Sequence, residues 1–228
     1  MRALTLAVSL VLLGSAGAGV AVANPPKCSD VGGTAGAGSA CVIQANDPAY
    51  MLNINFPTDY PDENAVFDYV KQTRDGFINV AKTPDSRGMP YELDTTTTQY
   101  SSAEPPRGTQ TVVFTTYQNI GGAHPQTFYK AFNWDRANRK PITFDTLFRA
   151  GTLPLPVIFP VVQAELTKQS GLPDPVSPLA GLDPANYQNF AITDDALIFF
   201  FGQGELLPES AGAVQVSVPR GPIDAMIA

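Results

Sequence analysis

The stretch Thr109–Asp135, TQTVVFTTYQNIGGAHPQTFYKAFNWD, decides the fold of this chain. Its two halves, Thr109–Asn119 and Gln126–Asp135, are rich in the threonine, valine and aromatic residues that favour strands. The connection between them is short and carries two glycines and a proline, as the turns of hairpins do. We therefore predict that the two halves pair as an antiparallel hairpin.

Further strands and two helices are predicted on both sides of this hairpin. Strand patterns cover residues 49–56, 91–101, 190–193, 196–201 and 214–218. Apolar residues at helical spacing predict helices over Asp62–Ala81 and Val157–Ser170, the second with Pro160 in its first turn and Gly171 as its stop. This mixture predicts an α+β fold, a mainly antiparallel sheet with helices packed on one face.

The N-terminus has the features of an export signal. Arg2 is followed by the apolar run Ala3–Leu13 and by small residues, and Ala21–Ala23 has the A-x-A pattern that signal peptidase cleaves. We expect residues 1–23 to be removed and the protein to be secreted, with Asn24 as its first residue. The run is shorter than the ~20 apolar residues that span a bilayer, so a retained anchor is the less favoured alternative and no stable membrane anchor is expected.

The two cysteines, Cys28 and Cys41, are expected to have a structural role, because an exported protein meets an oxidising compartment. In an oxidising compartment they are expected to form a disulfide, which would stabilise the fold by ~3 kcal/mol for a loop of this size. A redox pair would prefer C-x-x-C spacing, and a metal site would need further cysteine or histidine ligands. We therefore expect neither a metal site nor a cofactor.

Composition limits the classes of partner. The chain has 228 residues, 44% of them hydrophobic and 15% charged, as in a packed globular protein. Its formal net charge is -7, so the basic patches that bind nucleic acid or anionic lipid are missing. An unidentified protein or a component of the cell envelope is the expected partner, and the chain is expected to be a monomer.

The turn motif Gly121, Gly122, His124 and Pro125 contains the single histidine of the chain. A serine hydrolase needs a base beside its nucleophile, and only His124 could serve as that base. The alternative, which we favour, is a turn residue whose ring caps the backbone. The nucleophile-elbow pattern G-x-S-x-G is absent, so the nucleophile is unknown. The candidate nucleophiles are Ser101, Ser102 and Ser210.

Two further groups of residues have side chains that could serve a function. A glycosidase needs two carboxylates close together, and four carboxylates of this chain could supply them only if the fold brought two of the four side by side. The interpretation that we favour is that these four residues lie in solvated turns and helix caps. These are Glu165, Glu205, Asp194 and Asp195. The aromatic run Phe199–Phe201 is expected to lie in a core strand, and a surface that faces lipid or a partner is the alternative.

Long segments of the chain resemble a known family nearly end to end. They are DPAYMLNINFPTDYPDE (residues 47–63), PPRGTQTVVFTTYQNIGGAHPQTFYKAFNWD (105–135), KPITFDTLF (140–148), GLDPANYQNFAITDDALIFFF (181–201) and GELLPESAG (204–212). The family is that of the mycobacterial secreted immunogenic antigen numbered 64. The part from residue 105 onward also resembles the extracellular domain of lysozyme-sensing anti-sigma factors and of proteins associated with peptidoglycan deacetylases.

The resemblance implies a secreted, antigenic protein with a part at 24–104 and a domain at 105–228, packed together as one unit. Because the wider domain recognises lysozyme in the anti-sigma factors, a binding function is expected before a catalytic one. This chain departs from those sensors because it lacks their transmembrane and sigma-binding segments. The second hypothesis is a short-chain ester hydrolase with His124 as its base.

Overall fold

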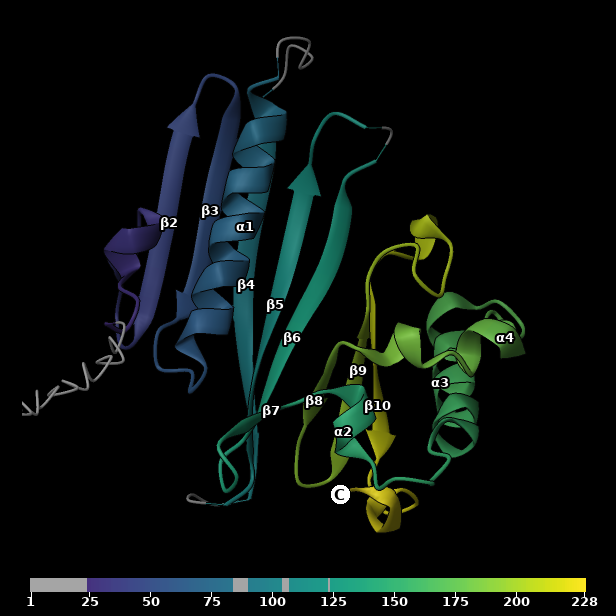
Figure 1. Ribbon diagram of the computed structural model, residues 1–228. Coiled ribbons are helices and arrows are strands. Elements are labelled where there is room, and N and C mark those ends of the chain that lie inside the picture. Colours follow the sequence, from purple (N-terminus) through teal and green to yellow (C-terminus); the bar gives the residue numbers. More distant parts are fainter. Residues whose placement is uncertain (1–23, 84–89, 104–106, 123) are drawn as a thin grey trace, which may run out of the picture.

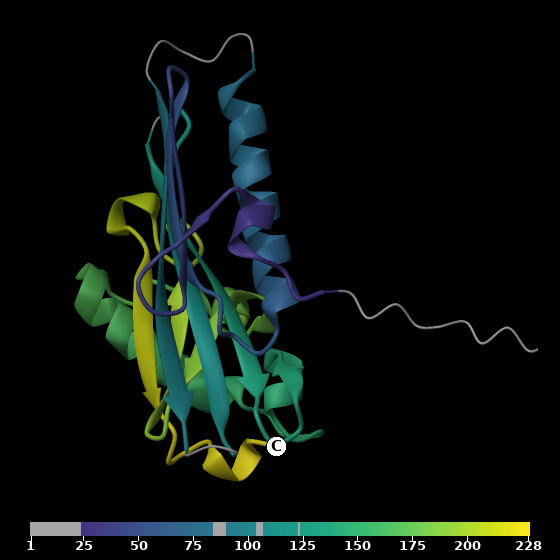
Figure 2. The ribbon, with the colours of Figure 1, turned by 90° about the vertical axis from the view of Figure 1, so that its left-hand side faces the viewer.

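The computed structural model describes residues 24–83, 90–103, 107–122 and 124–228, so the expected signal peptide lies outside the described residues. Two sheets face each other, and each has a helix on its outer face (Figures 1 and 2). The α+β class is confirmed. The helices do lie on one face of each sheet, but the chain builds two sheets rather than the one that was expected.

The larger sheet has seven strands in the order of the chain. They are β1 (Thr34–Ala35), β2 (Ala40–Asp47), β3 (Tyr50–Pro57), β4 (Tyr91–Ser102), β5 (Thr109–Asn119), β6 (Gln126–Asp135) and β7 (Lys140–Ile142). All neighbours are antiparallel except β3 and β4, which are parallel and are therefore joined by a helical crossover. The expected boundary at residues 104 and 105 falls between two strands, β4 and β5, that pair in this sheet.

The predicted hairpin is confirmed, with both of its strand limits. β5 and β6 pair antiparallel from Thr109 opposite Asp135 to Gln118 opposite Gln126. The alternation in these strands sends one set of side chains to each face of the sheet, because successive residues of a strand point in opposite directions. Val112 and Phe114 face the helix side, whereas Val113 faces the second sheet.

The crossover helix α1 (Glu63–Ala81) covers one face of the larger sheet (Figure 2). It begins where Asp62 accepts a hydrogen bond from the Ala65 N–H, which satisfies one of the free donors of the first turn. Its buried residues are Val66, Phe67, Val70, Phe77 and Ala81, which recur at helical spacing. They pack on alternate residues of β3 such as Leu52 and Ile54.

The smaller sheet has the order β10-β9-β8. Its strands are β8 (Phe190–Ile192), β9 (Ala196–Phe201) and β10 (Val214–Pro219). The helix α3 (Leu155–Ser170) covers its outer face and ends at Gly171, which has a φ of 70° as a C-terminal glycine cap should. The short helices are α2 (Phe144–Leu147), α4 (Pro178–Gly181), η1 (Cys28–Val31), η2 (Pro184–Tyr187), η3 (Glu209–Ala211) and η4 (Asp224–Met226).

The aromatic run in β9 is buried on both of its faces. Phe199 and Phe201 point toward α3 and are 0% exposed, whereas Phe200 points toward the larger sheet and packs with Val113 and Ala131. A strand covered on both sides reads as a continuous apolar run rather than an alternating one. The prediction of a core strand is confirmed.

Two details of the sequence interpretation are corrected by the structure. Helix α3 begins at Leu155, so Pro156 occupies its first turn and Pro160 lies inside the helix. A proline there leaves the carbonyl of the residue four positions earlier, Pro156, without its helical donor. Both prolines are exposed, so water can reach that carbonyl. The strand β2 was not predicted, because the apolar signal there is only two buried residues, Cys41 and Ile43.

The predicted disulfide is confirmed. Cys28 in η1 and Cys41 in β2 are bonded, which fixes the N-terminal segment to the second strand of the larger sheet. Gly33 lies beside the bridge, and a Cβ atom there would approach both sulfur atoms to 2.7 Å. Among the helices of the described residues, none has the length and apolar character needed to cross a bilayer.

Candidate functional site

Two hollows in the described surface combine polar side chains from several strands. The first is a cleft of about 250 Å³ at one end of the contact between the two sheets. The second is a shallow groove of about 540 Å³ across β2, β3 and β4. The two hollows share no lining residue, and they differ in charge.

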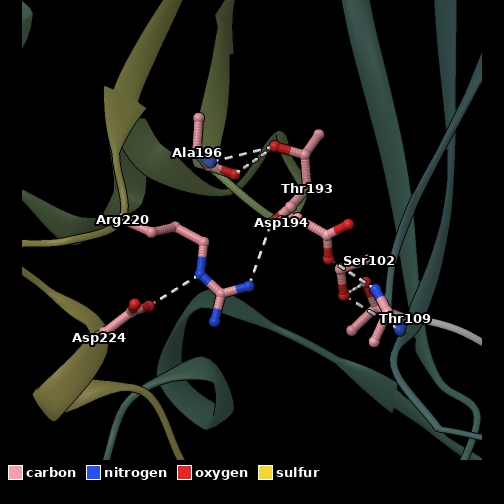
Figure 3. A network of polar contacts seen from close by, with 8 residues as sticks. Ser102, Thr109, Thr193, Asp194, Ala196, Arg220 and Asp224 are labelled. Atoms are coloured by element: carbon pink, nitrogen blue, oxygen red, sulfur yellow. Dashed lines mark hydrogen bonds and ion pairs between the residues drawn. The ribbon is translucent and has the colours of Figure 1, made fainter.

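The cleft is bordered by a network of hydrogen bonds that joins the two sheets (Figure 3). Arg220 follows β10, and its Nε donates to Asp224 Oδ1 at 2.8 Å. Its Nη1 donates to the carbonyl oxygen of Thr193, in the turn between β8 and β9, at 3.0 Å. On the larger sheet, the hydroxyl oxygens of Ser102 and Thr109 lie 2.8 Å apart.

The turn between β8 and β9 also binds the end of β4. The backbone N–H of Ala103 donates to Asp194 Oδ1 at 2.7 Å. Ala103 has a φ of 52°, a left-handed conformation that non-glycine residues rarely adopt. The interaction therefore holds a strained backbone beside Ser102, and such strain is often found at functional sites.

Asp135 and Lys140 line the same cleft at the end of β6. Partial burial tends to raise the pKa of Asp135, but hydrogen bonds from Asn138 and the charge of Lys140 outweigh it, so the pKa lies below its usual value. The carboxylate is thus held in its ionised form.

The groove lies on the face of the larger sheet opposite α1. The register places Asn53 between Gln44 of β2 and Asp94 of β4, so their side chains form a ladder across three strands. Asn53 Nδ2 donates to Asp94 Oδ1 at 2.7 Å, and Gln44 Nε2 donates to Asn53 Oδ1 at 3.4 Å. Glu92 lies on the same face, two residues before Asp94. None of the residues that line the groove is basic.

His124 lies in the turn of the hairpin, with an exposed side chain, and lines neither hollow. The serines Ser101 and Ser102 lie at the other end of the sheet, because Ser102 pairs with Thr109 at the start of β5. A strand of this length spans about 34 Å, which no hydrogen bond can bridge. Ser210 lines a separate pocket beside the end of α3, and His124 does not line that pocket.

The two glycines of the turn motif differ in backbone conformation. Gly121 has a φ of 74°, whereas the φ of Gly122 lies outside the left-handed region. A Cβ atom on Gly121 would also lie 3.1 Å from Cε1 of Tyr91. Gly121, not Gly122, is therefore the glycine that the turn requires.

The four carboxylates considered for a glycosidase pair have other roles or lie apart. Glu165 is paired with Lys168 at 3.2 Å on the surface of α3. Glu205 accepts a hydrogen bond from the Gly202 N–H at 2.7 Å, Asp194 accepts one from Ala103, and the neighbouring Asp195 is exposed. In the part of the chain that the structure describes, no three histidine, cysteine, aspartate or glutamate side chains are grouped to hold a metal.

Comparison with known proteins identifies a matching family model and a solved structure of similar fold. Residues 145–221 match the family model described as a protein of unknown function, DUF3298. The crystal structure of a DUF3298 family protein (PA4972) from Pseudomonas aeruginosa PAO1 has a similar fold, with a TM-score of 0.52 and 13% identity over 83% of this chain and 94% of that one.

Three relatives are much more similar, over nearly their whole length. The chain is 53% identical to the esterase Rv3036c of Mycobacterium tuberculosis over 216 residues, 95% of this chain and 93% of that protein. It is 57% identical to the immunogenic protein MPT64 of the same organism, and equally to MPB64 of Mycobacterium bovis, over 211 residues that make up 92% of each chain. This protein therefore belongs to the family of the mycobacterial immunogenic proteins MPB64 and MPT64.

Proposed function

We propose that this protein is exported and acts outside the cytoplasm by binding a partner protein with a basic surface, which docks in the groove formed by β2, β3 and β4. The observation that carries the proposal is the pair of carboxylates Glu92 and Asp94, half-buried side by side in a groove without a basic residue. The N-terminal sequence supports export, with cleavage after Ala23.

The chemistry of the groove suits lysine and arginine side chains. The amide oxygens of Gln44 and Asn46 and the carboxylates of Glu92 and Asp94 accept hydrogen bonds, and ammonium and guanidinium groups only donate them. A negative groove in a protein with a net charge of -7 also attracts a cationic partner over a distance near the Debye length, about 8 Å at physiological salt.

Binding of lysozyme, a basic protein, tests this proposal. The matched variants are Glu92→Gln/Asp94→Asn in the groove and Asp68→Asn/Glu209→Gln at exposed positions outside it, which remove the same charge. If the groove is the site, the first variant loses at least tenfold in affinity by surface plasmon resonance and the second changes by less than twofold. Lysozyme whose lysines have been acetylated is the control ligand, because acetylation removes their charge.

Equal losses in the two variants would show non-specific attraction to the net charge and would contradict the proposal. The same holds if acetylated lysozyme binds as tightly as the unmodified protein. Absence of binding by the wild-type protein would exclude lysozyme-like basic proteins as the partner class.

A second candidate function is hydrolysis of short-chain esters. It is favoured by one observation, the 53% identity to a relative that is named an esterase. The position of His124, far from Ser101 and Ser102, argues against a serine and histidine pair made from these residues. Hydrolysis of p-nitrophenyl butyrate by the wild type and by His124→Ala separates the cases: an activity that the substitution abolishes would make His124 the base and refute the turn interpretation.

A further inference from the structure

The outer edge of β2 is open along its C-terminal half. β1 pairs only with Cys41 and Val42 of this strand, and in the described part of the chain no strand pairs with the outer side of Ile43–Asp47. In Figures 1 and 2, no described element lies on the outer side of this half of β2. Its backbone groups can therefore bind another strand.

The hydrogen-bond pattern shows which backbone groups face outward. The Gly36 N–H donates to the carbonyl oxygen of Ala40, so Ala40 directs its backbone groups away from β3. Successive residues of a strand direct these groups to opposite sides, and the register with β3 runs without a bulge from Ala40 to Asp47. Gln44 and Asn46 therefore present two N–H groups and two carbonyl groups at the open edge.

The sequence of this edge does not protect it from pairing. Soluble proteins commonly protect free edges with lysine, proline or a bulge. The segment Ile43–Asn46 contains no charged residue and no proline, and both Gln44 and Asn46 are exposed. The same two residues line the groove that contains Glu92 and Asp94. A strand added to β2 would therefore border the negative groove.

We propose that the basic partner adds an extended segment to β2, antiparallel to it, as an eighth strand of the larger sheet with lysine or arginine side chains on the side of the groove. This inference rests on the proposed function, because it describes how the same partner binds. A second copy of the chain fits less well, because it would bring its own Asp47, Glu92 and Asp94 toward the same carboxylates. A basic segment is instead attracted by them.

Antiparallel pairing links the charge of the segment to its backbone. In a hydrogen-bonded pair of an antiparallel sheet, the two side chains lie on the same face. The partner residues opposite Gln44 and Asn46 therefore direct their side chains to the groove face and their own N–H groups to β2. If these residues are lysines, methylation of their backbone nitrogens removes the donors and keeps the charge.

The probe is the peptide KTKTKTK, in which lysine alternates with threonine, added to the ¹⁵N-labelled protein. We expect the amide hydrogens of Gln44 and Asn46 to exchange with solvent at least tenfold more slowly when the peptide is bound. A peptide methylated at the backbone nitrogens of its lysines should bind at least tenfold more weakly. Methylation at the threonines should change the affinity by less than threefold, because those N–H groups face away from β2.

Two substitutions at one position separate the backbone from the side chain. Gln44→Pro removes an outward N–H that β3 does not use, and edge strands tolerate proline for this reason. Its affinity for the peptide should fall at least tenfold. Gln44→Ala loses the same side chain but keeps the N–H, so its affinity should stay within threefold of the wild type.

Equal peptide affinity of Gln44→Pro and Gln44→Ala, both folded by circular dichroism, would overturn the proposal. If Gln44→Pro does not fold, amide exchange in the wild type decides: no slowing at Gln44 and Asn46 with millimolar peptide refutes strand addition. Slowing at these amides without peptide, as the protein concentration rises, would assign the edge to a second copy and refute it too.

Failure of this inference is distinguishable from failure of the groove. If Gln44→Pro binds the peptide normally while Glu92→Gln/Asp94→Asn loses affinity, the groove stands and strand addition is refuted. If the groove variant binds like the wild type while Gln44→Pro loses affinity, strand addition stands and the role of the carboxylates is refuted.

Discussion

The hairpin turn offers a comparison of two identical substitutions at adjacent residues. Gly121 has a φ of 74° and Gly122 lies outside the left-handed region. Gly121→Ala should destabilise the protein by about 1–2 kcal/mol, the cost of a left-handed conformation for a residue with a Cβ atom. The new methyl group would also lie 3.1 Å from the ring of Tyr91, which must shift.

Gly122→Ala should have the opposite sign or no effect. The nearest heavy atom to a Cβ there is the carbonyl oxygen of His124, at 3.9 Å, which is an ordinary contact. Replacing glycine in a compatible conformation stabilises by about 0.4–1 kcal/mol, because the unfolded chain loses conformational freedom. The two variants should therefore differ by about 1.5–3 kcal/mol.

Thermal unfolding followed by circular dichroism measures this difference. For a protein of this size 1 kcal/mol corresponds to about 2–4 °C in Tm, so Gly121→Ala should melt at least about 3 °C below Gly122→Ala. His124→Asn is the third variant and should keep the wild-type Tm, because its side chain is exposed. Equal Tm values for the two glycine variants would refute the assignment of the strained position to Gly121.

Three other predictions concern the core, the disulfide and one buried phenol. Phe199→Ala should destabilise by about 3–5 kcal/mol in urea unfolding, since its ring is 0% exposed; a loss under 1 kcal/mol would contradict that burial. Replacing Cys28 and Cys41 together by serine should cost about 3 kcal/mol, and a free-thiol count of two in the oxidised wild type would exclude the bond. Burial raises the pKa of Tyr187 from 10.0 to about 12. Because the folded state then keeps a proton that the unfolded state loses, stability should fall as pH rises from about 10 to about 12, and Tyr187→Phe should remove this part of the decline.

The sequence by itself determined the elements with strong local signals. Both strands of the hairpin Thr109–Asp135 have the limits that β-branched and aromatic composition predicted, because the short glycine-rich turn forces adjacent strands to pair. Helix α1 and the disulfide were also predicted, from apolar spacing and from two cysteines in an exported chain. These signals are local, so they do not depend on where the rest of the chain lies.

The tertiary structure alone decided how the sheets divide and where the sites lie. The parallel pairing of β3 and β4 joins residues about forty positions apart, and no local pattern encodes it. The sequence indicates only that Asn133 is a polar residue of a strand. In the structure its side chain is buried and donates a hydrogen bond to the carbonyl oxygen of Phe190 at 2.8 Å, across the contact between the two sheets.

The candidate sites also depend on tertiary packing rather than on local sequence. Arg220, Ser102 and Ile192 lie far apart in the sequence and meet in one cleft only because the second sheet folds onto the first. His124 is the single histidine of the chain, and the sheet places it about 34 Å from Ser101 and Ser102. Residue type and local spacing determine what a side chain can do, whereas long-range packing determines which other side chains it can reach.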